Sequence, residues 1–432
     1  MKNKTGIYLG SNIDESCYKN ILARPNVILI ASKTYTEATP TKYKEYLNFF
    51  DESLNEVNQD SFNYELIKNI ISDFNLPLLW SRSHRKFRRK YQSEISRFEF
   101  QLSIIHASIN FVIKHKLVKV CFAYEPHNLS TYIFKQTCLQ MGIKTFTLKV
   151  SPFPSRLFVI DNQQKSIIPN KKQTEFNLDS FINSRKINIS EEKTQKKCLF
   201  KTPLNRLLFH NFIYHQYLLK NVTTRDQIKK NDFITFFLHY QPEMTTLPDG
   251  GVFVDQFEAL KLMSKLCEKL NLKLVVREHP ATQTYFNWNW RNKSFVDKIL
   301  NLGSHILIDD FRESSNDILT QSKAIGTITG TVINESLING VPVIAFGDHP
   351  FKEYKGNSIV QFEGNFNSML EKISKILFID KEEILEEVKA YLAFASQKSF
   401  GANFEGIKKD QEIMTLWANR HKAVIDFIDT GI

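Results

Sequence analysis

Residues 324–347 read AIGTITGTVINESLINGVPVIAFG, an apolar segment followed by a helical pattern and a second apolar segment. The segments 324–328 and 343–346 predict buried strands, and residues 332–338 between them predict a helix. Asn339-Gly340 is typical of the end of a helix. A strand, a helix and a strand joined by short turns form a βαβ unit, and such units build parallel sheets. The stretch therefore predicts an α/β fold.

The same alternation extends upstream of this stretch. Three further strands alternate with three helices there: strands 233–238, 273–276 and 305–308, and helices 255–270, 294–302 and 316–321. The five strands with intervening helices predict a doubly wound sheet, in which 343–346 is the last clear strand. The first half of the chain has a similar pattern: strands 26–31, 119–124 and 144–150, and helices 64–71, 93–114 and 130–141.

A chain of 432 residues is too long for one hydrophobic core and fits two domains of roughly 150–200 residues each. We expect two Rossmann-like domains that face a cleft. The predicted order is a first domain at 1–162, a polar interdomain connection with local helices at 163–230, a second domain at 231–404, and a C-terminal helix at 405–432 that crosses back to the first domain.

The composition is typical of a soluble globular protein, with 42% hydrophobic and 24% charged residues. The sequence has no run of about 18 apolar residues, and its N-terminus has no apolar stretch long enough for a signal peptide. The five cysteines are scattered and form no C-x-x-C pair. We therefore expect buried thiols in a cytoplasmic protein, with neither a disulfide framework nor a zinc site.

The net charge of +11 predicts an acidic partner. The densest basic cluster is HRKFRRK at residues 84–90, directly before the predicted helix 93–114. One interpretation is a solvated helix start. The other is a patch that contacts the inner membrane, where each basic residue gains roughly 1 kcal/mol at an anionic surface. No nucleic-acid-binding motif accompanies the charge, so we expect no nucleic acid partner.

Polar clusters follow the predicted strands at their carboxyl ends, where open α/β sheets bind ligands. There are five such clusters: EPH at 125–127, HYQPE at 239–243, REHP at 277–280, TGT at 329–331 and GDH at 347–349. Their shared position predicts a ligand-binding cleft.

The cluster Thr329-Gly330-Thr331 has the features of a phosphate-binding loop. Glycine lets the backbone approach a phosphate closely, the threonine hydroxyls can donate, and the following helix N-terminus favours an anion. The alternative is that Thr331 only caps the helix. Glu335, one helical turn later, is placed to reach a ribose hydroxyl pair.

His279 and Arg277 follow the predicted strand 273–276. The histidine could neutralise or protonate a departing phosphate, and the arginine could add a fixed positive charge to the same site. The alternative for His279 is a structural role.

The ordered set QPE, EHP, GT-x-x-x-E and G-x-P-V-I-x-F-G resembles the bacterial capsule and O-antigen glycosyltransferases that use CMP-activated ulosonic acids, including the retaining β-Kdo transferases. The segments YEPHN (124–128), GIKTFTL (142–148) and SRLFVIDN (155–162) are similar to the acceptor domain of this group. Together, the matching segments cover rather less than half of the chain.

This resemblance implies a GT-B-like architecture, with an acceptor domain first and a nucleotide-sugar domain second. It places His279 on the donor phosphate, the residues 329–331 in the phosphate loop and Glu335 on the ribose. The residues it offers as an acceptor-side base are Glu125 and His127. The nucleophile of a retaining reaction stays open among three carboxylates, which are Glu243, Asp249 and Asp255, and the alternative for Glu243 is that it caps or braces its loop.

The predicted activity is therefore transfer of Kdo or a related ulosonic acid from a CMP-sugar to a growing capsule, O-antigen or lipopolysaccharide glycan, which is free or lipid-linked. The sequence has no D-x-D motif at a strand end, and CMP leaves with a single phosphate, so we expect neither a metal nor another cofactor. The alternatives are a UDP-sugar-dependent transferase or epimerase on the same fold, and a non-catalytic subunit of polysaccharide assembly.

Overall fold

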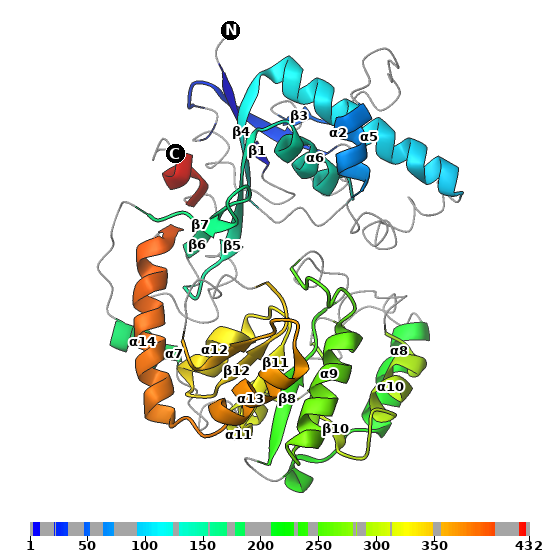
Figure 1. The fold of residues 1–432 in the computed structure, drawn as a ribbon, viewed down its shortest axis with the longest axis vertical. Coiled ribbons are helices and arrows are strands. Elements are labelled where there is room, and N and C mark those ends of the chain that lie inside the picture. The colour runs from blue at the N-terminus through cyan, green and yellow to red at the C-terminus, as the bar shows by residue number, and fades with distance from the viewer. Residues whose placement is uncertain are drawn as a thin grey trace. The chain divides into compact units, whose positions relative to one another are not determined.

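In the computed structural model of the protein, the chain builds two separate sheets, one in each of two units (Figure 1). The first unit consists of Met1–Phe176 and Phe394–Ile432, and the second of Asn177–Ala393. The structure describes residues 3–8, 21, 23–32, 47–51, 64–72, 93–123, 129–153, 156–170, 178–185, 209–228, 232–240, 249–279, 282, 291–311, 313–348, 356–401 and 423–428.

The sheet of the second unit has six parallel strands. They are β8 (Phe233–Phe237), β9 (Lys273–Arg277), β10 (Ile306–Ile308), β11 (Ala324–Thr327), β12 (Val343–Ala345) and β13 (Ile359–Gln361). Their spatial order is β10-β9-β8-β11-β12-β13, and every neighbouring pair is parallel. Numbered along the chain this is 3-2-1-4-5-6, the order of a Rossmann sheet. The order reverses between β8 and β11.

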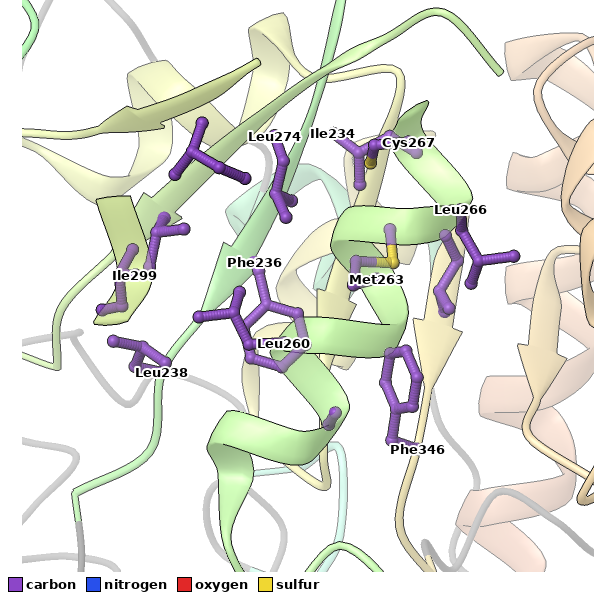
Figure 2. Packing of buried hydrophobic residues seen from close by; sticks show 14 of the residues in the cluster. Ile234, Phe236, Leu238, Leu260, Met263, Leu266, Cys267, Leu274, Ile299 and Phe346 are labelled. Carbon is purple, nitrogen blue, oxygen red and sulfur yellow. The ribbon is translucent and has the colours of Figure 1, made fainter. Parts of the chain in front are cut away.

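Strand side chains alternate between the two faces of this sheet and fill a separate core on each. Ile234 and Phe236 pack in the larger core with the apolar faces of α8 (Phe209–Lys220), α9 (Gln256–Lys269), α10 (Lys293–Leu300) and α13 (Phe366–Ile376). Figure 2 shows Leu260 and Met263 of α9 beside Phe236 of β8. On the other face, Phe233 packs with α11 (Ser315–Gln321), and Ile325 with α12 (Val332–Ile338). The sheet is therefore covered by helices on both faces.

Side-chain caps explain where several of these helices begin. A polar side chain just before α9, α10, α11 and α13 accepts a backbone N–H of the first turn, and the capping residues are Asp255, Asn292, Ser314 and Asn365. Such a cap satisfies one of the N–H groups that the helix itself leaves unpaired. The second unit also contains α7 (Leu178–Arg185), which contacts α12, and a short 3-10 helix, η6 (Arg225–Gln227).

The sheet of the first unit has the same order for its first six strands. These are β1 (Lys4–Tyr8), β2 (Val27–Ala31), β3 (Leu47–Phe49), β4 (Leu117–Phe122), β5 (Lys144–Val150) and β6 (Arg156–Asp161). β1 to β5 pair in parallel, whereas β6 is antiparallel to β5. The edge at β6 is extended by β7 (Ser166–Ile167) and β14 (Ser399–Gly401). Both units are therefore Rossmann-like, as the sequence predicts.

Helices and the end of the chain complete the first unit. α6 (Leu129–Gln140) contacts β5, α2 (Tyr64–Ile71) and α5 (Glu94–His115). The chain returns from the second unit through α14 (Lys381–Lys398), which leads into β14. Ala423, Val424 and Phe427 then join the core of the first unit. None of the helices among the described residues is long and apolar enough to cross a membrane.

Most predicted elements form within two residues of their predicted bounds, and the return of the C-terminal segment to the first unit is confirmed. Two further strands, β13 and β14, follow 343–346, the last strand that the sequence shows clearly. Each has only three residues, too few for a periodic pattern. The predicted helix 405–429 lies outside the described residues except for 423–428. The predicted connection, 163–230, contains the observed helices α7 and α8, and both belong to the second unit.

Candidate functional site

The point where the strand order of the second unit reverses has one histidine at its centre. His239 follows β8, and Thr329 follows the neighbouring strand β11. The backbone N–H of Thr329 donates to His239 Nε2 at 3.2 Å, and Thr327 Oγ1 lies 3.0 Å from the same nitrogen. Because Nε2 accepts the amide proton, the ring carries its own proton on Nδ1. Ligands of open α/β sheets bind at such a reversal.

Burial keeps this imidazole neutral. His239 is 5% exposed, and desolvation, with smaller contributions from His279 and Arg291, lowers its pKa to about 3. Its backbone is held by Gln256, the first residue of α9: the side-chain Oε1 accepts the His239 N–H at 2.8 Å, and Nε2 donates to the His239 carbonyl at 3.1 Å. His239 is therefore a rigid acceptor for the loop after β11.

A buried ion pair lies directly after β9. Arg291 donates from Nε to Glu278 Oε2 at 2.6 Å and from Nη2 to Glu278 Oε1 at 3.2 Å, and each side chain is 1% exposed. The hydroxyl of Tyr214, from α8, also donates to Glu278. The Arg291 guanidinium stacks on Phe295, 4.4 Å from the ring centroid. Arg291 Nη2 donates further to the His239 carbonyl at 2.9 Å.

His279 is attached to this ion pair through its backbone. Its N–H donates to Glu278 Oε1 at 2.7 Å, and its carbonyl accepts the hydroxyl of Thr282 at 2.7 Å. The imidazole lies beside Tyr240, with the ring centroids 6.3 Å apart. Burial lowers the pKa of His279, Glu278 opposes this effect and Arg291 adds to it. The ring therefore favours the neutral form, and a bound phosphate would raise its proton affinity.

The loop 329–331 is tightly packed at its centre. A Cβ on Gly330 would lie 2.9 Å from Thr327 Oγ1, so only glycine fits there without displacement. Thr331 is exposed and precedes α12, but its side chain makes no capping hydrogen bond, which removes the support for the interpretation that it only caps the helix. Glu335 is exposed in the first turn of α12.

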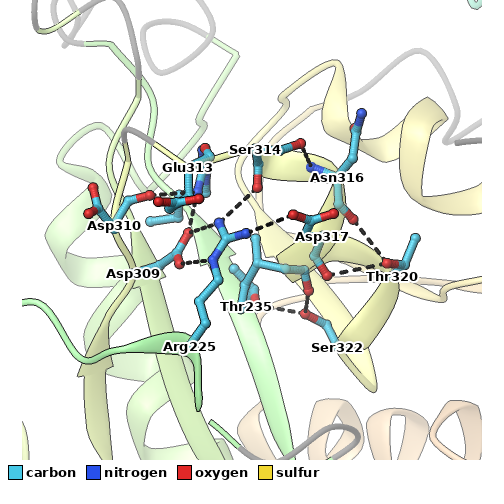
Figure 3. A network of polar contacts seen from close by, with 12 residues as sticks. Arg225, Thr235, Asp309, Asp310, Glu313, Ser314, Asn316, Asp317, Thr320 and Ser322 are labelled. Carbon is cyan, nitrogen blue, oxygen red and sulfur yellow. Dashed lines mark hydrogen bonds and ion pairs between the residues drawn. The ribbon is translucent and has the colours of Figure 1, made fainter. Parts of the chain in front are cut away.

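The guanidinium of Arg277 contacts a second polar network, at the end of β10. Its guanidinium pairs with buried Asp309 and donates to the carbonyls of Asp310 and Glu313, at 3.3 and 2.7 Å. In Figure 3, Arg225 lies between Asp309 and Asp317, at 3.1 and 3.2 Å. Contact of Arg277 with a phosphate stays a prediction.

The candidate carboxylates are distributed over several loops. Asp255 caps α9, its side chain accepting the N–H of Phe257 at 3.0 Å. The carbonyl of Asp249 accepts the N–H of Asp348 at 2.5 Å, which brings this segment against the loop after β12. The other three candidates, Glu243, Glu125 and His127, lie outside the described residues. Among the described residues, no group of three or more His, Cys, Asp or Glu side chains could hold a metal ion.

The sequence does not single out four residues that the structure brings to this site, which are Tyr214, His239, Glu278 and Arg291. His239 and Glu278 lie within the strand-end clusters HYQPE and REHP, so their position was a usable signal. Tyr214 lies in a helical segment of the predicted connection and Arg291 lies just before the predicted helix 294–302, but no motif marks either residue, and only the folded chain brings them to Glu278.

No protein-family model matches the chain, and no curated protein matches its sequence. Among solved structures, it is similar to the UDP-GlcNAc 2-epimerase of Methanocaldococcus jannaschii in complex with UDP-GlcNAc and UDP, with 11% identity and a TM-score of 0.32 over 90% of this chain and 99% of the other. It is similar to the β-Kdo 2,7-transferase KpsC of Thermosulfurimonas dismutans, with 12% identity and a TM-score of 0.36 over 72% and 88% of the two chains. For Anabaena HepE in complex with UDP-glucose, the identity is 12% and the TM-score 0.34, over 91% and 95%. Similarity at this level assigns neither a family nor an activity.

Proposed function

We propose that this protein is a glycosyltransferase that moves Kdo or a related ulosonic acid from a CMP-sugar to a growing cell-surface polysaccharide. The observation that carries the proposal is the hydrogen bond between Thr329 N–H and His239 Nε2, at the reversal of a 3-2-1-4-5-6 sheet. It joins the residues just before two of the motifs on which the resemblance to CMP-sugar transferases rests, since His239 precedes QPE and Thr329 precedes GT-x-x-x-E. The third motif, EHP, is connected to them because Arg291 donates to the His239 carbonyl and pairs with Glu278.

The chemistry of these groups suits a leaving phosphate. The N–H of Thr329 donates to His239, and those of Ile333 and Asn334 donate to the carbonyls of Gly330 and Thr331, so the backbone donors proposed for an anion are the N–H groups of Gly330, Thr331 and Val332. His279 favours the neutral form in the free protein, binds a proton as the phosphate arrives, and stabilises the charge that develops on the departing CMP. Arg277 adds positive charge, and Glu335 binds the ribose hydroxyls.

The remaining assignments concern the sugar and the acceptor. In a retaining reaction, a carboxylate attacks the anomeric carbon as the bond to CMP breaks, and the acceptor hydroxyl then displaces that carboxylate while a base removes its proton. Glu243 is the first choice for the nucleophile, with Asp249 and Asp255 as the others. Glu125 and His127 are the proposed bases. The proposed reaction needs no metal.

A thermal-shift screen with CMP, UDP, GDP and their sugars tests the proposal. A ligand at about 100 times its dissociation constant stabilises the folded protein by roughly 2.7 kcal/mol, which such a screen detects. Stabilisation by CMP and CMP-Kdo alone supports the proposed donor. Stabilisation by UDP compounds instead supports a UDP-sugar-dependent transferase or epimerase, and no response to any nucleotide supports a non-catalytic assembly subunit.

The proposed place of action is the cytoplasmic face of the inner membrane, with a glycan or lipid-linked glycan as acceptor. Support for a membrane contact comes from the basic cluster 84–90, which lies outside the described residues, and from the apolar side chains that follow it. Ile95 and Phe98, in the first turns of α5, are 72% and 46% exposed.

A further inference from the structure

The guanidinium of Arg291 links the segments that follow β8 and β9. Nη2 donates to the carbonyl of His239 at 2.9 Å. Nε and Nη2 also donate to the carboxylate of Glu278, and Oε1 of that carboxylate accepts the backbone N–H of His279 at 2.7 Å. One planar group therefore holds both histidine segments, the first directly and the second through a single carboxylate.

His239 extends this connection to the loop after β11. Its Nε2 accepts the N–H of Thr329 at 3.2 Å, while Gln256 holds its backbone on both sides. The imidazole stays neutral, so the acceptor is present over the whole physiological pH range. A continuous path of hydrogen bonds and backbone therefore connects His279 to Thr329.

The stability of the fold does not by itself explain why Arg291 and Glu278 are buried here. Arg291 and Glu278 are each 1% exposed, so both charges are removed from water. Arg291 Nη1 is also buried, and no described residue places a hydrogen-bond acceptor near it. A buried donor without an acceptor and a buried ion pair both oppose folding, and well-packed apolar replacements are often as stable or more so.

We infer that Arg291 and Glu278 are positioning residues that set the distance between His279 and the loop 329–331. This inference rests on the proposed function, in which these two parts hold the phosphate of the donor. A planar guanidinium with donors at fixed angles is suited to the task, whereas a lysine ammonium on a flexible chain is not. Small displacements of groups that contact a reacting ligand are enough to weaken their action.

The first test replaces the planar group and keeps its charge. Arg291→Lys is expected to weaken binding of CMP by at least about tenfold in isothermal titration calorimetry, with UDP measured in parallel. The matched control is Arg225→Lys, since Arg225 also pairs with a buried aspartate of the same unit, Asp309. The control is expected to bind within about twofold of the wild type. Thermal unfolding of both variants shows whether they are equally folded.

The second test separates positioning from stability. The triple variant Tyr214→Phe, Glu278→Met, Arg291→Met removes the buried polar cluster as a whole and leaves no unpaired charge. We expect thermal stability close to that of the wild type, yet CMP binding at least about tenfold weaker. In the same samples, the His279 ring resonances are expected to titrate at a shifted pH, because both charged neighbours are gone.

These experiments distinguish failure of the inference from failure of the proposed function. Wild-type protein that binds CMP, with a triple variant that recovers both stability and full affinity, would show that the cluster only stabilises the fold and would overturn the inference. Equal affinity of Arg291→Lys and Arg225→Lys would do the same. Wild-type protein that binds neither CMP nor UDP would contradict the proposed function, and the inference with it.

Discussion

In the proposed mechanism, the protonation state of His279 connects donor binding to the transfer step. Its ring favours the neutral form before the donor binds, because burial and Arg291 lower its pKa. A residue in the proposed role, which gives a proton to the leaving phosphate, raises the rate by about 10²–10⁴. We therefore expect His279→Ala to lower turnover of a CMP-sugar by that factor. His305→Ala is the control, because His305 bonds to Ser264 in the same unit and has no proposed role. Near-wild-type turnover of His279→Ala would return His279 to a structural role.

His239 makes the stability of the fold depend on pH. Its pKa is about 3 in the folded protein and about 6.5 in an unfolded chain, so the unfolded state binds a proton that the folded state excludes. The stability that this neutral histidine contributes is fully present above about pH 6.5 and is lost as the pH falls towards 3, by up to about 1.4 kcal/mol per pH unit. Urea unfolding between pH 7 and pH 4 measures this slope. His239→Gln is expected to flatten it, and equal slopes would contradict the assignment.

At the scale of elements, the turn after β12 packs directly against the loop after β11. A Cβ on Gly347 would lie 2.5 Å from Thr329 Cγ2 and 2.7 Å from the carbonyl oxygen of Asp249. Gly347→Ala is therefore expected to lower the free energy of unfolding by about 1–3 kcal/mol and to displace the loop 329–331. Urea unfolding and CMP titration measure the two effects.

The control for this substitution is Gly364→Ala. A Cβ there has open space, and the cost comes only from the backbone, which has a φ of +88°. Gly364→Ala is expected to lose some stability and keep its affinity for CMP. Loss of affinity in both variants would mean that general destabilisation, and not loop displacement, governs binding.

The elements differ in how far the sequence could predict them. β5 and α12 form at their predicted residues because long apolar or amphipathic runs specify one structure. β1, with the sequence KTGIY, and β13, with IVQ, are too short or too polar for that, and they become strands because their neighbours in the sheet pair with them. The β order 3-2-1-4-5-6 follows from such pairings and has no local signal.

The sequence likewise predicts one part of the candidate site and does not predict another. The loop 329–331 could be predicted because glycine, hydroxyls and a helix start occur together in sequence. The ion pair that holds His279 could not, because its partners come from 13 and 64 positions away from Glu278. Only tertiary packing selects Arg291 and Tyr214 from the many polar residues of those segments.

For the whole molecule, the first unit depends on the end of the chain. Arg156, buried in β6, donates to Ser399 Oγ at 2.8 Å and to the carbonyl of Ser396 at 3.3 Å, and Phe400 and Phe427 fill the core beside Phe146. A chain that ends at residue 393 should therefore lose the folded first unit. We expect limited proteolysis to digest residues 1–176 of this chain while 177–393 survive, and to leave both regions of the full chain intact. Resistance of 1–176 in the truncated chain would contradict this.

The net charge of +11 leads to a prediction about the membrane. Charge reversal at Arg85, Arg88 and Arg89 is expected to reduce binding to anionic liposomes at low salt, because each basic residue near such a surface contributes about 1 kcal/mol. CMP binding should be unchanged in the same variant. Sedimentation with vesicles of anionic and of neutral lipid measures the effect. If the wild-type protein does not sediment with anionic vesicles, the cluster is a solvated helix start.

The discontinuous first unit also sets an order of events during synthesis. Arg156 leaves the ribosome 243 residues before Ser399, its partner in β14. At roughly 5–20 residues per second, this interval lasts about 12 to 50 seconds. Throughout that time residues 156–158 lack the strand with which they pair in the folded protein, and unpaired strand segments can pair with other nascent chains. The second unit is one continuous segment, Asn177–Ala393, so it needs no segment that is made later. It can therefore complete its fold before the first unit does, although most of the first unit is made earlier.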